Sequence, residues 1–157
     1  MDKHGRKNQQ TFDTMSFSQK YKISYKETAS PEEVQILRDG IIAEAFKAKG
    51  MGKIVPFSFF VRDSEERIIA GIQGSTFYGC LYTNLLWVAP QVRKQGLGAL
   101  LLHKAEDLGR ERNCSFATLT TMDWEALIFY QKLGYEIEYV REGFEKNSKM
   151  FLLRKSL

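Results

Sequence analysis

The chain has 157 residues, a length typical of one domain and sufficient to bury a core without a metal or a disulfide. Hydrophobic residues make up 43% and charged residues 27%, which excludes a disordered or fibrous protein. No apolar run approaches the ~20 residues of a membrane span, and the first residues lack the apolar stretch of a signal peptide. We therefore expect a cytoplasmic protein without a membrane partner, with Cys80 and Cys114 as half-buried, structural thiols.

The formal net charge is +4, and half of it falls in the polar residues 1–20. We expect residues 1–20 to form a disordered extension and residues 21–157 to form a single domain. Nucleic-acid binding requires basic side chains clustered on a folded face, so a net charge of which half lies in a polar tail is poor support for it. We expect no nucleic-acid partner, and a mild positive charge favours a small anionic ligand instead.

The first half of the chain predicts a strand, a helix and three further strands. Residues 21–26 alternate in the manner of a strand, and Ser30-Pro31 followed by two acids is typical of a helix start. Apolar residues then recur at helical spacing until Gly50. Residues 55–62 and 67–77 are separated by a polar turn and predict a hairpin, and residues 81–88 form a third run that stops before Pro90.

The second half predicts two helices and three strands. Residues 97–112 carry the clearest amphipathic pattern, and a shorter helix is predicted over residues 123–132. The three strands are predicted over residues 115–121, 135–141 and 149–154. The whole order predicts an α/β (α+β) fold, in which helices cover both faces of a mixed, mostly antiparallel sheet of about seven strands.

A glycine-containing loop joins the strand that ends at Val88 to the long helix. Amides at a helix start lack intrahelical partners and carry partial positive charge from the helix dipole. Gly96 and Gly98 remove side chains that would keep an anion from those amides, and Arg93 and Lys94 add positive charge. The loop therefore predicts a cradle for a phosphate or pyrophosphate.

Other interpretations of the same loop are weaker or remain open. A nucleotide P-loop requires Lys-Ser or Lys-Thr after its glycine, whereas Ala99-Leu100 follows Gly98. A dinucleotide fingerprint requires a small residue at position 101, which is a leucine. A tight turn with incidental glycines fits the Gly-x-Gly spacing equally well.

Two motifs together resemble the GNAT N-acetyltransferase superfamily. Arg93-x-x-Gly96-x-Gly98 is similar to the superfamily's coenzyme A pyrophosphate signature, and residues 126–135 (ALIFYQKLGY) are similar to its Ala-x-x-Phe-Tyr-x-x-x-Gly-Phe/Tyr segment. One predicted strand separates the motifs, as in that superfamily. The resemblance covers roughly residues 80–140 and implies a GNAT-like sheet with acetyl-CoA as co-substrate and no metal.

The resemblance also implies where the coenzyme lies. The strand ending at Val88 is expected to carry a bulge and to splay from the strand over residues 115–121, with pantetheine in the gap. The amide of Val88 would stabilise the thioester oxyanion, and the side chains of Trp87 and Val88 are expected in the core. The residues implied in cofactor binding are Leu86, Trp87, Val88, Arg93, Lys94, Gln95, Gly96, Leu97, Gly98, Ala99, Asp123, Phe129 and Tyr130.

Tyr130 matches the tyrosine that protonates the departing thiolate in this superfamily, although it could also be a half-buried packing residue. Phe129 is expected to pack rather than react. Asp123 stands where many members have an asparagine that binds pantetheine amides, and an aspartate also suits a helix N-cap.

No carboxylate occupies residues 81–86, where many relatives carry the general base. Asn84 holds a plausible catalytic position but can only order a water molecule. Glu125, Glu136 and Glu138 are unranked alternatives, and direct transfer through solvent water is another.

The main hypothesis is thus an acetyl-CoA-dependent N-acetyltransferase acting by direct attack of a primary amine. A small-molecule acceptor is preferred to a protein lysine or N-terminus, because the chain has no appended recognition module. A non-catalytic acyl-CoA sensor is the second hypothesis. The acceptor, the acyl length and the oligomeric state, a homodimer among the options, stay open.

Overall fold

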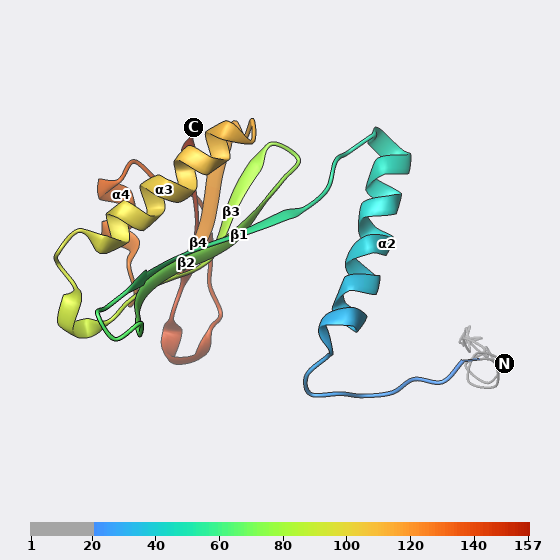
Figure 1. Cartoon of the computed structure of the whole chain (residues 1–157), viewed down its shortest axis with the longest axis horizontal. Helices are drawn as coiled ribbons and strands as arrows, with labels where there is room; N and C mark the ends of the chain where they lie inside the picture. Colours follow the sequence, from blue (N-terminus) through green and yellow to red (C-terminus); the bar gives the residue numbers. More distant parts are fainter. Residues whose placement is uncertain (1–20) are drawn as a thin grey trace, which may run out of the picture. The chain divides into compact units, whose positions relative to one another are not determined.

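The computed structural model describes residues 21–157, so the predicted extension over residues 1–20 lies outside the described part (Figure 1). The chain divides into two units, one ending at Arg38 and the other running from Asp39 to Leu157. The strand predicted over residues 21–26 is wrong, because this segment has no regular secondary structure. Alternating side chains make a strand only when a neighbouring strand pairs with its backbone, and no such pairing is found for these residues.

Helix α2 spans Pro31–Lys49 and begins with a reciprocal capping box. The amide of Glu33 donates to the Ser30 hydroxyl at 3.3 Å, and the amide of Ser30 donates to the Glu33 carboxylate at 2.9 Å. Gly50 follows with a φ of 65°, a left-handed conformation that terminates the helix. The predicted start and end of this helix are therefore confirmed.

One six-stranded sheet forms the framework of residues 39–157, in the order β1-β2-β3-β4-β6-β5. Only β3 and β4 pair in parallel, and all other neighbours are antiparallel. The mixed, mostly antiparallel sheet is confirmed, with six strands instead of about seven because residues 21–26 add none. The strands are β1 (Val55–Arg62), β2 (Ile68–Phe77), β3 (Cys80–Val88), β4 (Phe116–Met122), β5 (Glu136–Arg141) and β6 (Met150–Ser156).

Helix α3 (Leu97–Glu111) lies across β2, β3 and β4 and covers the centre of the sheet (Figure 1). Its residues Leu101, Leu102 and Ala105 are buried in a core shared with α4 (Leu127–Lys132) and the strands. The short helix starts four residues later than predicted, because residues 123–126 form a turn. Beside the core, the fully buried Glu106 carboxylate pairs with Lys155 of β6 at 2.8 Å.

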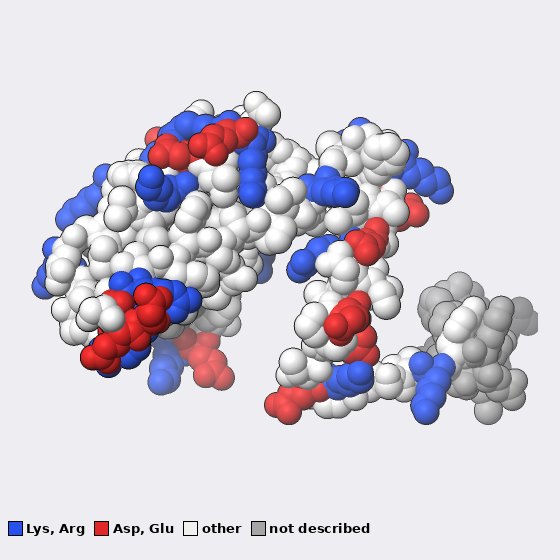
Figure 2. Space-filling model, viewed as in Figure 1, with Lys and Arg blue, Asp and Glu red and all other residues white. Residues whose placement is uncertain are grey.

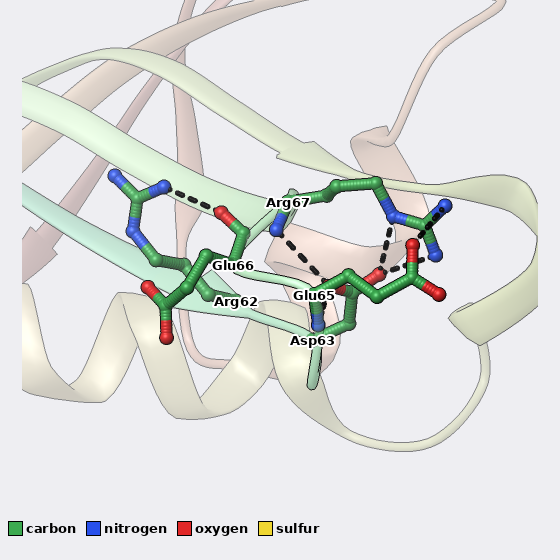
Figure 3. A network of polar contacts seen from close by, with 5 residues as sticks. All are labelled: Arg62, Asp63, Glu65, Glu66 and Arg67. Carbon is green, nitrogen blue, oxygen red and sulfur yellow. Dashed lines mark hydrogen bonds and ion pairs between the residues drawn. The ribbon is translucent and has the colours of Figure 1, made fainter.

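A polar network closes the β1–β2 hairpin (Figure 3). One carboxylate oxygen of Asp63 accepts the amides of Glu65 and Arg67 at 2.9 and 3.0 Å, and the other accepts Arg67 Nε at 2.8 Å. Arg62 donates to the Glu66 carbonyl at 2.8 Å, at a position where φ is 61°. These bonds satisfy a turn whose backbone would otherwise depend on water.

On the face shown in Figure 2, basic and acidic side chains lie beside one another rather than in separate single-sign patches. No helix within residues 21–157 is long and apolar enough to cross a membrane. Cys80 and Cys114 are both free and both buried, more deeply than predicted.

Candidate active site

A gap between β3 and β4 creates the main cavity. The two strands pair only over four residues, Cys80–Thr83 with Phe116–Leu119, although β3 continues to Val88 and β4 continues to Met122. Beyond Thr83 no pairing between them is found in the described chain. The gap opens a cavity of about 910 Å³, which reaches the start of α3 and the inner face of α4.

A β-bulge at Asn84 sets the orientation of the strand that borders this gap. Gln73 pairs with Leu85 whereas the next residue, Gly74, pairs with Thr83, so Asn84 is the extra residue. Past the bulge, the amide of Ala89 donates to the carbonyl oxygen of Ile69. Ala70 and Val88, which lie opposite each other, are therefore a non-hydrogen-bonded pair of the antiparallel ladder. Hydrogen-bonded and non-hydrogen-bonded pairs alternate along an antiparallel ladder, so the backbone N–H and C=O groups of Leu86 and Val88 point away from β2, toward the gap.

The loop before α3, predicted to be an anion cradle, lies at one end of the cavity. Gly96 is the N-cap in a left-handed conformation, with a φ of 83° and no side-chain capping bond. A Cβ on Gly98 would lie 3.3 Å from the Phe129 ring, so glycine keeps the first turn of α3 bare. Arg93 Nε donates to the Val88 carbonyl at 2.9 Å and ties the loop to the end of β3. These features leave the first amides of α3 available to an anion.

Tyr130 lies at the other wall of the cavity, on α4. Its side chain is only 7% exposed and makes edge-on ring contacts with Phe129 and Tyr135. Burial, followed by the negative charge of Glu125, raises the pKa of Tyr130 to about 12. Its phenol therefore stays protonated through neutral and mildly alkaline pH.

Residues 56–137, over half of the chain, match the acetyltransferase (GNAT) domain family. The chain belongs to the GNAT acetyltransferase family. An acetyltransferase of Agrobacterium fabrum is 30% identical over 109 residues, which cover 69% of this chain and 80% of the relative. A blasticidin-S acetyltransferase of Streptomyces morookaense is 35% identical over 71 residues, 45% of this chain and 52% of the relative.

Solved structures agree with this assignment. A protein from Agrobacterium tumefaciens that is described as an acetyltransferase superposes with a TM-score of 0.75 at 26% identity. The match covers 87% of this chain and all of that one. The protein is therefore an acetyltransferase with the GNAT fold.

The structure brings most of the expected site residues of this acetyltransferase to one cavity. The expected residues that line it are Asn84, Leu86, Trp87, Val88, Arg93, Lys94, Gly96, Leu97, Gly98, Ala99, Phe129 and Tyr130. Gln95 and Asp123 are not among its lining residues. Asp123 is not the cap of α4 either, because Ala126 holds that position and the Asp123 amide donates to Lys149.

The prediction that the Trp87 side chain lies in the core is wrong, because that side chain is half exposed. The bulge at Asn84 is the reason. It shifts the alternation of β3, so that Leu86 and Val88 pack against the core while Leu85 and Trp87 face the other way. Trp87 thus offers an aromatic surface to the cavity that it lines.

Sequence reasoning missed the wall of the cavity that β4 supplies. It also missed Thr83 on β3, whose buried hydroxyl has no hydrogen-bond partner among the described residues. The run Leu119-Thr120-Thr121 at the end of a predicted strand was a signal, because a splayed partner strand must present its last residues to the gap. The missed lining residues are Thr83, Leu85, Val92, Leu119, Thr120, Thr121 and Ala126.

The fold places the three carboxylates that were considered as the general base at two different sites. Glu125 lines the cavity, together with Trp124. Glu136 and Glu138 lie on β5 at a different depression, where Glu138 pairs with Arg154 at 3.4 Å. No group of three metal-ligating side chains is present within residues 21–157.

Proposed function

We propose that this acetyltransferase transfers the acetyl group of acetyl-CoA to a primary amine of a small molecule by direct attack. The observation that carries the proposal is the continuity of the cavity. One end meets the anion cradle at the start of α3, and the middle is the gap in which β3 has unpaired backbone groups. A ligand with a pyrophosphate and an extended amide-bearing arm fits both features.

Coenzyme A would be held by the cradle and by β3. The first amides of α3, with Arg93 and Lys94, suit the pyrophosphate because they offer donors and positive charge without a covering side chain. The gap-facing N–H and C=O groups of Leu86 and the Val88 amide suit the amides of pantetheine, which would pair with them as an added strand does. When bound, the coenzyme supplies an acetyl thioester that is open to attack by an amine.

Two groups of the chain support the transfer step. The Val88 amide can donate to the carbonyl oxygen as negative charge develops there. Tyr130 can donate its phenolic proton to the departing sulfur, since burial keeps the phenol neutral. Asn84, at the bulge, can order a water molecule near the reacting atoms.

A small acceptor is supported by the apolar and aromatic part of the lining. Trp87 and Trp124 are both exposed at the cavity and can hold a planar or apolar body. The similarity to a blasticidin-S acetyltransferase makes an antibiotic amine a reasonable first probe.

A non-catalytic acyl-CoA sensor is the second candidate, because β3 carries no carboxylate at the position expected for a base. The two candidates differ in turnover. We would measure thiol release from acetyl-CoA with blasticidin S, polyamines, aminoglycosides, amino acids and lysine peptides, and coenzyme A binding by thermal shift. Release with a small amine supports the proposal, whereas stabilisation by coenzyme A without release from any amine supports the sensor. No stabilisation at all contradicts both.

A further inference from the structure

Glu125 places a carboxylate in the lining of the cavity. It lies in the turn between β4 and α4 and is the only carboxylate among the cavity's described lining residues. Its side chain remains exposed at the cavity. The other two carboxylates considered as bases, Glu136 and Glu138, line a separate depression.

The carboxylate of Glu125 is held in place through one oxygen. Oε2 accepts the Met122 amide at 2.8 Å and the Thr121 hydroxyl at 3.2 Å. Both hydrogen bonds reach the same atom, which leaves Oε1 as an acceptor for a ligand. A carboxylate anchored at one oxygen is a preorganised receiver for a cation, because little side-chain entropy remains to be lost.

The charge of Glu125 also acts on Tyr130, which lies five residues further along the chain and lines the same cavity. It is the second cause, after burial, of the raised pKa of Tyr130. Both groups line the same cavity. The other charged groups of the lining, Arg93 and Lys94, belong to the anion cradle.

We propose that the Glu125 carboxylate binds the ammonium group of the acceptor and accepts the proton that it must lose before attack. This inference rests on the proposed amine acetyltransferase function. It names the substrate class more narrowly, as an amine that is cationic at neutral pH. It also places the general base on the turn before α4 instead of on β3.

The proton and electron balance follows from these positions. The ammonium N–H bond breaks, and the proton goes to Glu125 and then to solvent. The freed nitrogen lone pair forms the C–N bond to the acetyl carbon, the C–S bond breaks, and its electron pair leaves with sulfur. Tyr130 protonates the sulfur, and the second proton lost by the nitrogen restores Tyr130 through solvent. The products are the acetylated amine, coenzyme A and one proton.

Glu125→Gln is the matched variant, because the amide oxygen of glutamine can still accept the Met122 and Thr121 hydrogen bonds. Two acceptors are compared, spermidine as a cationic amine and hydroxylamine as one that is largely neutral at mildly alkaline pH. We expect kcat/KM for spermidine to fall about 100-fold in Glu125→Gln, with hydroxylamine losing less than about fivefold. The KM for acetyl-CoA should not change.

The pH profile separates a base from a merely structural residue. Wild-type kcat/KM for spermidine should level off toward alkaline pH, whereas that of Glu125→Gln should keep rising as solvent takes over the proton. Glu125→Asp, which keeps the charge, should restore part of the rate. Glu136→Gln is the control and should match the wild type.

An equal loss for both acceptors, or no loss for spermidine, would overturn the assignment of Glu125 while leaving acetyl transfer intact. If the wild type releases no thiol with either probe or with the wider amine panel, the proposed function fails and this inference fails with it. An equal melting temperature of Glu125→Gln and wild type would show that the fold is unchanged.

Discussion

Gly74 on β2 lies against the carbonyl oxygen of Tyr82 on β3, so closely that a Cβ atom at position 74 would overlap that oxygen. The Phe57 ring of β1 covers the same position from the other side, 2.8 Å from such a Cβ. Gly74 is also the residue that pairs with Thr83 directly beside the bulge. The bare glycine thus allows β3 to approach β2 where the strand changes register and turns toward the cavity.

Gly74→Ala should therefore damage both stability and catalysis. The added methyl meets backbone that cannot move without shifting the bulge, and we expect a loss of about 1–3 kcal/mol in the free energy of unfolding. Urea denaturation measures that loss, and thiol release measures the accompanying fall in kcat. Gly52→Ala is the control, since a Cβ there meets nothing within 4 Å, and it should leave both quantities intact or slightly improved.

Gly96→Ala tests the cradle. The left-handed φ of 83° should cost about 1–2 kcal/mol with any other side chain. The methyl meets no atom of the protein within 4 Å, so an effect on acetyl-CoA beyond this strain would come from contact with the ligand. We expect the KM for acetyl-CoA to rise about tenfold, by roughly 1.4 kcal/mol of lost binding.

Gly50→Ala is the matched control for that variant. Gly50 has a φ of 65° and equally open surroundings, but it does not line the cavity. It should show a similar loss of stability with an unchanged KM for acetyl-CoA. If the two variants behaved alike in both assays, the cradle would have no special contact with the coenzyme.

Tyr130→Phe removes the proposed proton donor and keeps the ring. We expect kcat to fall at least about 100-fold with little change in either KM. Because the pKa of Tyr130 is raised to about 12, the wild type should show no alkaline loss of kcat from this group below about pH 10. Tyr135→Phe removes the hydroxyl of another buried tyrosine, outside the cavity lining, and should retain activity.

Lys155→Met should destabilise the fold, because it leaves the buried carboxylate of Glu106 without its nearest cation. Glu106 is 1% exposed, and its carboxylate lies 2.8 Å from Lys155 Nζ. Removal of the cation leaves Arg110, at 3.8 Å, as its remaining ion-pair partner. We expect a loss of about 3 kcal/mol in unfolding free energy. The double variant Lys155→Met/Glu106→Leu should regain much of the lost unfolding free energy, because no unpaired charge stays buried. If the losses of the two single variants simply added in the double variant, the buried charge would not be the cause.

The hydrogen bonds to Asp63 predict that the protein loses part of its stability only at acidic pH. The hydrogen bond from Arg67, followed by backbone amides, lowers the pKa of Asp63 below its usual 3.8. The resulting stabilisation is present above that value and is lost as pH falls through the lower folded-state pKa. Asp63→Asn should reduce the melting temperature at neutral pH and narrow the difference from wild type in strong acid.

Local sequence signals were sufficient where neighbouring residues determine the structure. The Ser30–Glu33 capping box, the bounds of β1 and the start of α3 at Leu97 all follow from short patterns, and the structure confirms them. The motif at residues 93–98 led to the family, and the family match over residues 56–137 confirms it. The strand over residues 21–26 failed because strand formation depends on a partner that no local pattern reveals.

The amino-acid order alone therefore established the family, nearly all of the elements and the glycine-containing start of α3, because spacing and capping act over a few residues. Only the tertiary structure separated β3 from β4 beyond Thr83, turned Trp87 outward and brought Glu125, but not Glu136 or Glu138, to the cavity. Those outcomes depend on the bulge at Asn84 and on contacts between strands far apart in sequence. Pairing across a sheet determines which backbone groups stay unpaired, and the unpaired groups border the cavity.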